Sequence, residues 1–576
     1  MARLIKYIEP YIGMVIFAII LLFGQAACDL ALPDFMSDII NDGIAAGNSA
    51  TIGKIGLKML GISLLSASSS VIVGYLASRI AAGFSKNLRL NLFKKVESFS
   101  NKEFDEFSTS SLITRTTNDI TQVQTLVFMM IRLIFYAPIM GVGGFVHALA
   151  KSKSMSWIIA VAVISLFCII ALVFVTIIPK FKKIQNLIDK LNLVVRENLD
   201  GMLVIRAFST QKFEEKRFDN VNSELTKTNL FVNRVTSGIM PAMMLIMNLV
   251  TITVVWVGSK QISAFKMEVG DMMAYMQYVV QIIMAFLMMS MLFILMPRAE
   301  VSANRIADVL EKEPSVKDNE STVNDFTPSH GRIEFKNVCF RYPKADEDVL
   351  HNINFSAEIG QTTAFIGSTG SGKSTLVNLI PRFYDVTEGE ILIDGINILN
   401  LKLHDLRSVL GYVPQKGVLF SGTIESNLKY ADKNVGEDKI LKAATIAQAM
   451  EFINAKQETF QTSIAQGGTN VSGGQKQRLS IARALLKEPK IYIFDDSFSA
   501  LDYKTDVTLR NALKKETGNS TVLLVAQRIS TIINADKIVV LDNGHIVGIG
   551  THESLMENCE VYKEIAMSQF SKEELE

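Results

Sequence analysis

Six long apolar runs in the first half of the chain constrain its fold more than any other feature. Each run is close to or above the ~20 residues that a helix needs to cross ~30 Å of hydrocarbon. Soluble proteins rarely repeat such lengths six times, so we predict six transmembrane helices. The first run lacks a small-residue cleavage site, and we expect it to be retained. The runs lie at roughly Tyr11–Leu32, Ile55–Ala82, Leu126–Leu149, Trp157–Ile178, Gly238–Val257 and Met272–Met296.

Basic residues predict how these helices are oriented, because Lys and Arg mark the cytoplasmic side of a membrane protein. They are frequent at the N-terminus and in the connections Phe84–Gln124 and Lys180–Arg234, whereas Asp34–Gly53 carries only acids. We therefore expect the N-terminus and both long connections to be cytoplasmic. Lys151 and Lys153, on the predicted outer side, disagree with this assignment.

The two cytoplasmic connections have helical spacing of their apolar residues, so we expect the membrane helices to continue into the cytoplasm. Two polar breaks interrupt them, at Ser98–Ser111 and Gly201–Thr210. We predict that these breaks form short crosswise helices that contact the C-terminal domain.

Several polar residues lie inside the apolar runs, where they are costly and usually face a bundle interior or a watery cavity. Gln277 and Gln281 are one helical turn apart and share a face beside Tyr278. Interhelical hydrogen bonding without a role in transport remains an equal alternative, and Arg132 can reach an interface. The other residues of this kind are Gln25, Asp29 and Asn248.

Methionine is concentrated in the last two runs, since Met240–Met296 contains about half of the 25 methionines. Thioether side chains adapt to apolar shapes, so this segment forms either ordinary helix contacts or a wall for hydrophobic substrates.

The four cysteines lie far apart and predict neither a disulfide framework nor a zinc site. The net charge of +1 gives no indication of nucleic-acid binding.

The composition turns polar at Glu311–Gly331, which predicts a linker, and alternating strands and helices follow it. The predicted domains are thus 1–310 for the membrane, 311–331 for the linker and 332–576 for an α/β domain. Within the last, Gly367–Ser374 fits the phosphate-loop template G-x-x-x-x-G-K-[ST] between an apolar strand and a helix. Its backbone would wrap a polyphosphate, Lys373 would meet the β- and γ-phosphates, and Ser374 would bind Mg²⁺.

Four further patterns extend this site. Tyr342 ends a strand-like run and could stack on an adenine ring, and Gln415 follows Gly411–Pro414, where its amide could reach Mg²⁺ and a water. Ser472–Gln475 has capping-box spacing at the start of a helix, which gives an anion site. Ile491–Asp495 reads as a buried strand that delivers Asp495 to the Mg²⁺ shell.

These motifs, in this order, resemble the ATPase domain of ABC transporters from Ile333 to about Ser568, with Ser499–Asp502 as the D-loop. With six spans ahead of it, the chain resembles a half-size ABC exporter: an all-α polytopic membrane domain with long cytoplasmic helices, plus an α/β P-loop ATPase domain. The segment Glu197–Phe218 is similar to that family's second cytoplasmic loop. The resemblance implies ATP and Mg²⁺ as ligands and dimers in which each ATP lies between one chain's phosphate loop and the other's signature.

The resemblance also assigns the site residues. The hydrolytic residues would be Asp496, Gln527 and Gln415, and the Mg²⁺ ligands Ser374, Gln415 and Asp495. The ATP-binding residues would be Tyr342, Gly367, Ser368, Thr369, Gly370, Ser371, Gly372, Lys373, Ser374, Thr375, Ser472, Gly473, Gly474, Gln475 and Asp502.

Two positions depart from the family pattern, which has Glu after the strand aspartate and His in the switch loop. This chain has Asp496 and Gln527 there, while Gly367–Ser374 and the signature are intact. Ala465–Gly468 also lacks the family's usual charged residues. The combination resembles the degenerate subunit of a heterodimeric multidrug-type exporter, which binds ATP well and cleaves it poorly.

Three hypotheses follow from these residues. The first is one half of a bacterial inner- or plasma-membrane exporter of hydrophobic or amphipathic small molecules, paired with a second half-transporter. The second is an ATP-binding regulatory membrane subunit without transport of its own, and the third is a slow homodimeric exporter. The motifs do not distinguish drugs, lipids and peptides as cargo.

Overall fold

The computed structural model describes residues 2–318, 330–343 and 345–569, so positions 319–329 of the predicted linker lie outside the described residues. The chain divides into two compact units. The membrane unit comprises Met1–Glu97 and Thr109–Lys312, and the C-terminal unit comprises Ser98–Ser108 and Glu313–Glu576. The segment Ser98–Ser108 therefore groups with the C-terminal unit, although it lies within the 1–310 range predicted for the membrane domain.

Six long helices build the membrane unit, and they account for the six predicted spans. Each contains a window long and apolar enough to cross a membrane. The longest has 53 residues, about 80 Å at ~1.5 Å per residue, so the helices extend beyond a ~30 Å hydrocarbon core as predicted. The helices are α1 (Ile12–Asp38), α2 (Ser49–Glu97), α5 (Ile120–Lys151), α6 (Ser156–Asp200), α8 (Gln211–Ser263) and α9 (Val269–Glu311).

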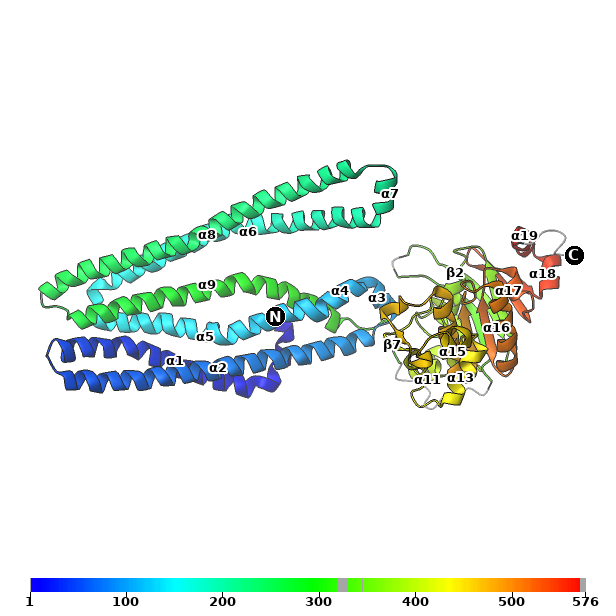
Figure 1. Cartoon of the computed structure of the whole chain (residues 1–576), viewed down its shortest axis with the longest axis horizontal. Coiled ribbons are helices and arrows are strands. Elements are labelled where there is room, and N and C mark those ends of the chain that lie inside the picture. Colours follow the sequence, from blue (N-terminus) through cyan, green and yellow to red (C-terminus); the bar gives the residue numbers. More distant parts are fainter. Residues whose placement is uncertain (1, 319–329, 344, 570–576) are drawn as a thin grey trace. The chain divides into compact units, whose positions relative to one another are not determined.

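These helices lie side by side in pairs, α1 with α2, α5 with α9 and α6 with α8 (Figure 1). The close approach of α5 to α9 depends on small residues. A Cβ atom at Gly144 of α5 would lie 3.1 Å from Cγ1 of Ile282 in α9, so a larger residue would force the Ile282 side chain to shift. Large apolar side chains such as Ile20 and Leu57 are exposed on the outer faces, as expected of a surface that lipid covers.

Short helices and single turns connect the long helices. The predicted break at Ser98–Ser111 contains α3 (Asn101–Phe107) and the start of α4 (Thr109–Thr114), and the break at Gly201–Thr210 contains α7 (Met202–Ala207). Short helices are thus found in both predicted segments. The remaining short segments are the 3-10 helices η1 (Ala2–Tyr7), η2 (Glu9–Tyr11) and η5 (Lys153–Met155) and the π-helical segments η3 (Ile39–Ile44) and η4 (Arg115–Asp119).

Helix α3 is attached to the rest of the C-terminal unit by specific hydrogen bonds. Ser100 and Glu103 form a capping box at its start, and Glu103 Oε1 accepts a hydrogen bond from the backbone N–H of Ser315 at 3.2 Å. Tyr384 Oη donates to Asp105 Oδ2 at 3.0 Å. The predicted contact of the first break is therefore confirmed, whereas the contact of α7 stays a prediction.

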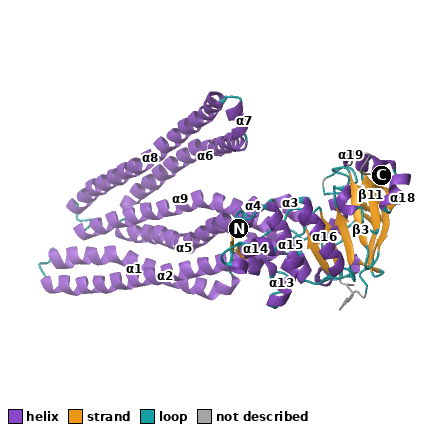
Figure 2. Ribbon diagram, turned by 45° about the vertical axis from the view of Figure 1, so that its right-hand side comes forward, coloured by secondary structure: helices purple, strands orange, loops and turns teal. Residues whose placement is uncertain are grey.

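The C-terminal unit is built on two main sheets, whose strands are coloured orange in Figure 2. The first sheet has the order β2-β1-β4-β5 and is antiparallel. The second has the order β12-β11-β3-β10-β9-β6, parallel except for β12. The strands of the first sheet are β1 (Ile333–Phe340), β2 (Leu350–Ala357), β4 (Glu388–Ile393) and β5 (Ile396–Asn397). Those of the second are β3 (Thr362–Gly367), β6 (Leu410–Val413), β9 (Ile491–Asp495), β10 (Thr521–Val525), β11 (Lys537–Asp542) and β12 (His545–Gly550).

Side chains that alternate along the central strands divide the core into two layers. Ala364 and Ile366 of β3 join one apolar cluster, while Phe365, between them, joins the other. This is the period of two expected for a strand that is buried on both faces. Every residue of β9 and β10 is buried, so these strands hold the residues at their carboxyl ends firmly in place.

Helices cover both faces of the parallel sheet. The predicted helix after the phosphate loop is α10, which starts at Lys373, two residues before the predicted start, and the predicted signature helix is α15. A small two-stranded sheet pairs β7 (Gly422–Thr423) antiparallel with β8 (Ser463–Ile464). The helices are α10 (Lys373–Leu379), α11 (Leu403–Ser408), α12 (Ile424–Leu428), α13 (Glu437–Ile446), α14 (Met450–Asn454), α15 (Gly473–Leu486), α16 (Tyr503–Glu516), α17 (Ile529–Ile532), α18 (His552–Asn558) and α19 (Glu560–Gln569).

Candidate active site

The loop between β3 and α10 has the backbone and the cation that a polyphosphate requires. Gly370 and Gly372 adopt φ values of 88° and 96°, a left-handed region that favours glycine. The ammonium of Lys373 donates to the carbonyl oxygens of Gly367 at 2.9 Å and Ser368 at 2.7 Å. Burial lowers the pKa of Lys373, while the charges of Asp495 and Asp496 oppose that shift. The loop thus holds a buried cation at the start of α10.

Tyr342 lies next to this loop, as the sequence predicts. Its hydroxyl is hydrogen-bonded to Thr375 Oγ1 at 2.9 Å. Its ring packs edge-on against Phe340, with 4.9 Å between ring centroids, and against Tyr384 at 5.3 Å. The aromatic group is therefore fixed beside the first turn of α10.

Strand β9 places Asp495 against the loop. Ser374 Oγ donates to Asp495 Oδ1 at 2.7 Å, and the Asp495 side chain is buried. Burial raises the pKa of Asp495, the hydrogen bond from Ser374 opposes this, and the neighbouring Asp496 adds to it. The hydroxyl of Ser374 and the carboxylate of Asp495 therefore lie side by side. Their oxygen atoms are the kind of ligand that Mg²⁺ prefers.

Asp496 is the meeting point of three strand ends. Its backbone has a φ of 47°, and its N–H donates to the carbonyl of Val525 at 3.0 Å. Two amides reach its Oδ2: Gln415 Nε2 from the end of β6 at 3.2 Å and Gln527 Nε2 from the end of β10 at 2.9 Å. The three residues proposed for hydrolysis therefore lie together.

Burial raises the pKa of Asp496, and the hydrogen bond from Gln415 and the charges of Lys373 and Arg528 oppose this shift. A cavity of about 10 Å³, lined by Asp496 and Gln527 among others, adjoins the carboxylate. That volume is about what one water molecule needs.

The signature lies apart from this group within one chain. Ser472 Oγ accepts from Gln475 N at 3.3 Å and Gln475 Oε1 accepts from Ser472 N at 3.1 Å, which confirms the capping box. Asp502 instead caps α16 by accepting from Thr505 N at 2.9 Å, and that hydrogen bond lowers the pKa of Asp502. Among the described residues, no hydrogen bond or ion pair joins Ser472–Gln475 to the phosphate loop.

The matches to known proteins cover both units of this chain. Residues 15–286 match the family model described as the ABC transporter transmembrane region, and residues 350–499 match the one described as ABC transporter. An uncharacterised ABC transporter ATP-binding protein of Mycobacterium tuberculosis is 39% identical over 99% of this chain and 98% of its own length.

The chain belongs to the ABC transporter family. A second relative, the ABC transporter ATP-binding protein YfiB of Bacillus subtilis, is 38% identical over 100% of this chain and 99% of its own. The ATP-dependent lipid A-core flippase of Haemophilus influenzae is 30% identical over 99% of this chain and 97% of its own. A solved bacterial Atm1-family ABC exporter with ATP bound shares the fold, with a TM-score of 0.78 over 97% of this chain and 98% of that one, at 24% identity.

The ABC exporter fold predicted from the sequence is therefore confirmed. The protein is an integral membrane ATPase coupled to transport, and ABC exporters of this kind function as dimers. Its nucleotide is ATP, since the C-terminal unit is an ABC ATPase domain.

One residue of the exporter's ATPase unit that the sequence analysis overlooked is Gln477. Its side chain is buried; its Oε1 accepts from Gly417 N at 3.1 Å, and its Nε2 donates to the Pro414 carbonyl at 3.0 Å. These bonds tie α15 to the segment that carries Gln415. The available signal was a glutamine on the buried face of the predicted signature helix.

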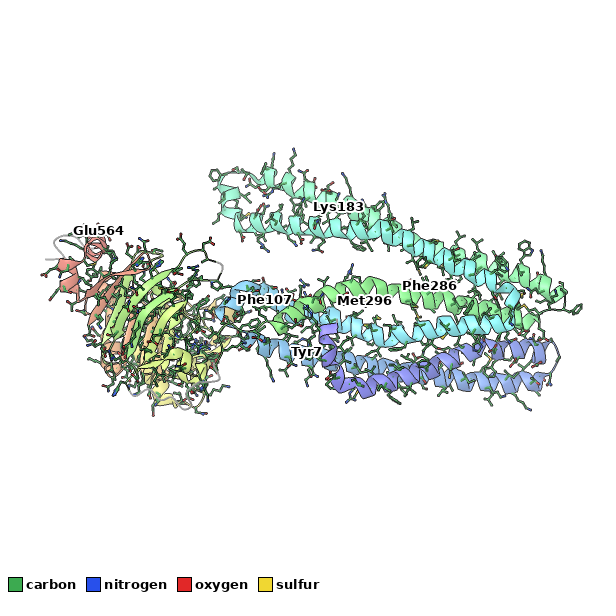
Figure 3. The ribbon with its side chains drawn as sticks, turned by 180° about the vertical axis from the view of Figure 1, so that it is seen from behind. Tyr7, Phe107, Lys183, Phe286, Met296 and Glu564 are labelled. Carbon is green, nitrogen blue, oxygen red and sulfur yellow. The ribbon has the colours of Figure 1, made fainter. Side chains whose placement is uncertain are left out.

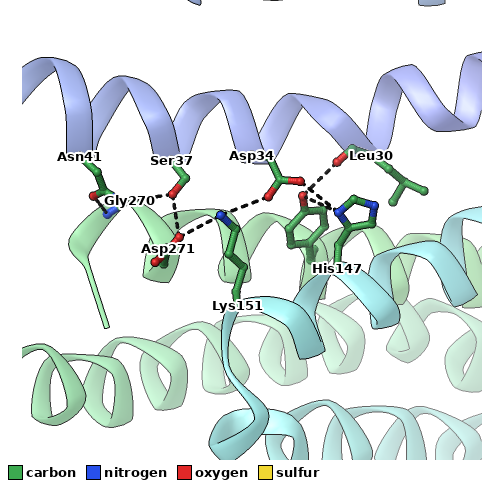
Figure 4. Close-up of polar contacts among 9 residues, drawn as sticks. Leu30, Asp34, Ser37, Asn41, His147, Lys151, Gly270 and Asp271 are labelled. Atoms are coloured by element: carbon green, nitrogen blue, oxygen red, sulfur yellow. Dashed lines mark hydrogen bonds and ion pairs between the residues drawn. The ribbon is translucent and has the colours of Figure 1, made fainter. Parts of the chain in front are cut away.

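A polar cluster ties three helices of the exporter's membrane unit together (Figure 4). Lys151 Nζ of α5 lies 3.3 Å from Asp34 Oδ1 of α1 and 2.9 Å from Asp271 Oδ1 of α9. His147 Nδ1 lies 3.0 Å from Asp34 Oδ2, and Ser37 Oγ donates to Asp271 Oδ1 at 2.9 Å. Lys151 is a basic residue on the predicted outer side, where the charge rule does not expect one, and it is paired there with two acids.

The other intramembrane residues have unequal surroundings. Gln281 Nε2 donates to the Asp29 carbonyl at 3.2 Å, and Asp29 accepts from Ser66 at 2.6 Å and Tyr136 at 2.7 Å. Gln277, predicted to share a face with Gln281, is exposed. Arg132 and Asn248 are also exposed, while Gln25 is partly buried. The predicted pair of glutamines therefore does not act as one polar surface.

Proposed function

We propose that this chain is one subunit of an ATP-driven exporter of hydrophobic or amphipathic compounds in a bacterial inner or plasma membrane. It would bind ATP at a site of low hydrolytic activity and supply Ser472–Gln475 to the active site of an unlike partner. The observation that carries this proposal is the arrangement at Asp496, whose carboxylate meets two neutral amides, Gln415 and Gln527.

The chemistry at Asp496 disfavours hydrolysis. Asp is one methylene shorter than the Glu of the family pattern, which withdraws the carboxylate by roughly 1 Å, and a misplacement of that size can cost ~10²-fold in rate. Gln527 cannot carry the positive charge that makes a hydrogen bond to a phosphate about twice as strong. Neither change touches Gly367–Ser374, so binding is retained.

The residues present fit Mg²⁺. Ser374 and Asp495 offer neighbouring oxygen atoms, and Gln415 offers an amide oxygen if its side chain turns away from Asp496. Such a small number of protein ligands suits Mg²⁺, which keeps several waters and phosphate oxygens. When bound, the ion would neutralise phosphate charge; Ser374 and Asp495 would position it.

Two observations support an amphipathic cargo. Relatives of about 30% identity over nearly the whole chain are lipid A-core flippases, and the methionine-rich stretch Met240–Met296 supplies adaptable apolar side chains. The flippase name applies to those proteins, and the lipid class of the cargo here is our proposal.

If this chain's own ATP site is weakly hydrolytic and the partner's site is active, two substitutions should have unequal effects on steady-state ATP turnover of the assembled complex. Ser472→Ala removes a donor from the partner's active site and should lower turnover by ~10²-fold, the loss seen when one transition-state donor is removed. Lys373→Ala empties the weak site and should cost less than about tenfold. Because Ser472 also caps α15, Ser472→Thr, which keeps the hydroxyl, is the control.

Equal losses from Ser472→Ala and Lys373→Ala would favour a homodimer, in which both groups serve every site. Mass determination of the purified complex gives an independent check by finding or failing to find an unlike second chain. ATP-dependent movement of a lipophilic dye into vesicles separates the exporter from the regulatory subunit, which would bind ATP without flux.

A further inference from the structure

A large cavity lies among the helices of the membrane unit, near one end of their apolar runs. Its volume is about 840 Å³, within the range of ligand pockets. Its walls come from α5, α6, α8 and α9; Figure 3 marks α6 by Lys183 and α9 by Met296. The apolar lining includes Val173, Ile177, Phe181, Ile239, Pro297 and Val301. An apolar body of considerable size would fit it.

Two arginines line this cavity, and their surroundings differ. Arg305 is committed to the protein, since its Nη2 lies 2.6 Å from Asp119 Oδ1, which also accepts from Ser302 at 2.8 Å. Arg298 has no ion pair with any carboxylate among residues 2–318, 330–343 and 345–569. Its guanidinium carbon lies 5.6 Å from the centroid of the Phe181 ring.

The contact with Phe181 gives the direction of Arg298. Arg298 belongs to α9 and Phe181 to α6, so the guanidinium reaches toward the opposite wall of the cavity. A cation over an aromatic ring gains some stabilisation, but its planar donors are left for an acid group, which arginine binds in a bidentate manner. A positive ligand would be repelled, and a neutral one would leave the donors unused.

We propose that this cavity binds an amphiphile with one acidic headgroup, held by Arg298, and an apolar body along Ile177, Phe181 and Val301. The inference rests on the proposed function, because it names the class of compound that the exporter takes up. It goes further by assigning charge recognition to one residue. Gln122, also in the lining, is positioned to contribute an amide.

The test uses the assembled full-length complex in vesicles without ATP, with two photoreactive probes that share one alkyl chain. One probe carries a sulfonate, which stays ionised, and the other a hydroxyl. We expect the sulfonate to label peptides that contain Phe181 or Val301, and Arg298→Gln to lower that labelling roughly tenfold, the value of one charge-assisted hydrogen bond. Labelling by the alcohol should not change.

Arg132→Gln is the matched control, because Arg132 is an exposed arginine of α5 outside the cavity lining. It should leave labelling by both probes unchanged. Val301→Trp, which fills the cavity, should reduce labelling by both. Phosphatidylglycerol that competes with the sulfonate, where phosphatidylcholine does not, would identify a bilayer phospholipid as the source; no competition would identify a soluble amphiphile. Both results uphold the site.

Equal labelling by sulfonate and alcohol in the native complex, or no effect of Arg298→Gln, would overturn the proposal. So would Val301→Cys forming crosslinks to a partner chain in place of probe labelling, since a second polypeptide would then fill the cavity. Selective labelling without ATP-driven transport of any amphiphile would uphold the site and refute the exporter function. ATP-driven transport without selective labelling would do the reverse.

Discussion

The carboxylates of the membrane unit and those of the ATPase unit have different partners. In the membrane unit, Asp34 and Asp271 both lie within ion-pair distance of Lys151. In the ATPase unit, Asp495 meets the hydroxyl of Ser374, and Asp496 meets two amides. Charge is compensated by a direct ion pair in the first region and by neutral donors in the second.

This difference separates a structural cluster from a reactive one. The acids around Lys151 come from α1 and α9 and the lysine from α5, so the shared cation holds three helices together. The acids at the end of β9 are buried without a cation in direct contact, which keeps their pKa values raised. They are therefore suited to meet a metal ion and a water molecule.

The largest effect is expected when the family pattern is restored at the ATP site of the ATPase unit. Asp496→Glu combined with Gln527→His moves the carboxylate forward by roughly 1 Å and provides a group that can carry positive charge, so hydrolysis at this site should rise by up to ~10²-fold. Turnover by the assembled complex measures it, in a background where Ser472→Ala silences the partner's site. Each single substitution should give a smaller gain, and no gain from the pair would contradict the roles assigned to both residues.

The first region is tested by removing its cation. Lys151→Met keeps the length of the side chain but leaves Asp34 and Asp271 facing each other without compensation. Both acids are partly exposed, so we expect a loss of only about 1–2 kcal/mol in the free energy of unfolding, below the ~3–5 kcal/mol of a fully buried pair. Thermal unfolding in detergent measures this loss.

Lys153→Met is the matched control for that change, because Lys153 is an exposed lysine two positions along the chain. It should leave the unfolding temperature within error of the native value. If both substitutions had the same effect, the ion pairs of Lys151 would not stabilise the packing of α1, α5 and α9.

These two regions differ in how far they were predictable from sequence. The phosphate loop, β9 and the capping box of α15 follow from short local patterns, and the structure has them where the patterns place them. The polar cluster around Lys151 was not predicted, because counting charges cannot show that Asp34 and Asp271, 237 positions apart by their numbering, meet one lysine. Helix packing decides that, and no local pattern reports it.

The glutamines show the same limit. Periodicity correctly places Gln277 and Gln281 one turn apart, yet Gln281 bonds to α1 while Gln277 is exposed. Gln477 was given no role from the sequence, because its bonds to Gly417 and Pro414 depend on how α15 lies against β6 and the segment that follows it. In each case the rotation of a helix against its neighbours determined the role of the side chain.

The smallest expected effect concerns the acid dissociation of Asp496. Burial raises its pKa above the ordinary 3.8, so ionising this group costs more in the folded protein than in the unfolded chain. The penalty is complete above the folded pKa and absent below 3.8. Asp496→Asn should therefore raise the unfolding temperature near neutral pH, by an amount on the order of 1 kcal/mol in stability, and the gain should shrink as the pH falls through that window.

Asp394 provides a control of opposite sign. Burial pushes the pKa of Asp394 up, but hydrogen bonds from the backbone N–H groups of His330, Gly331 and Arg332 outweigh it, so its pKa is lowered. Its ionised form stabilises the fold above 3.8, and that contribution is lost as the pH falls through the lowered folded pKa. Asp394→Asn should thus destabilise the protein near neutral pH where Asp496→Asn stabilises it. If both substitutions shifted the unfolding temperature in the same direction, burial would not penalise the ionised carboxylate of Asp496 as its raised pKa implies.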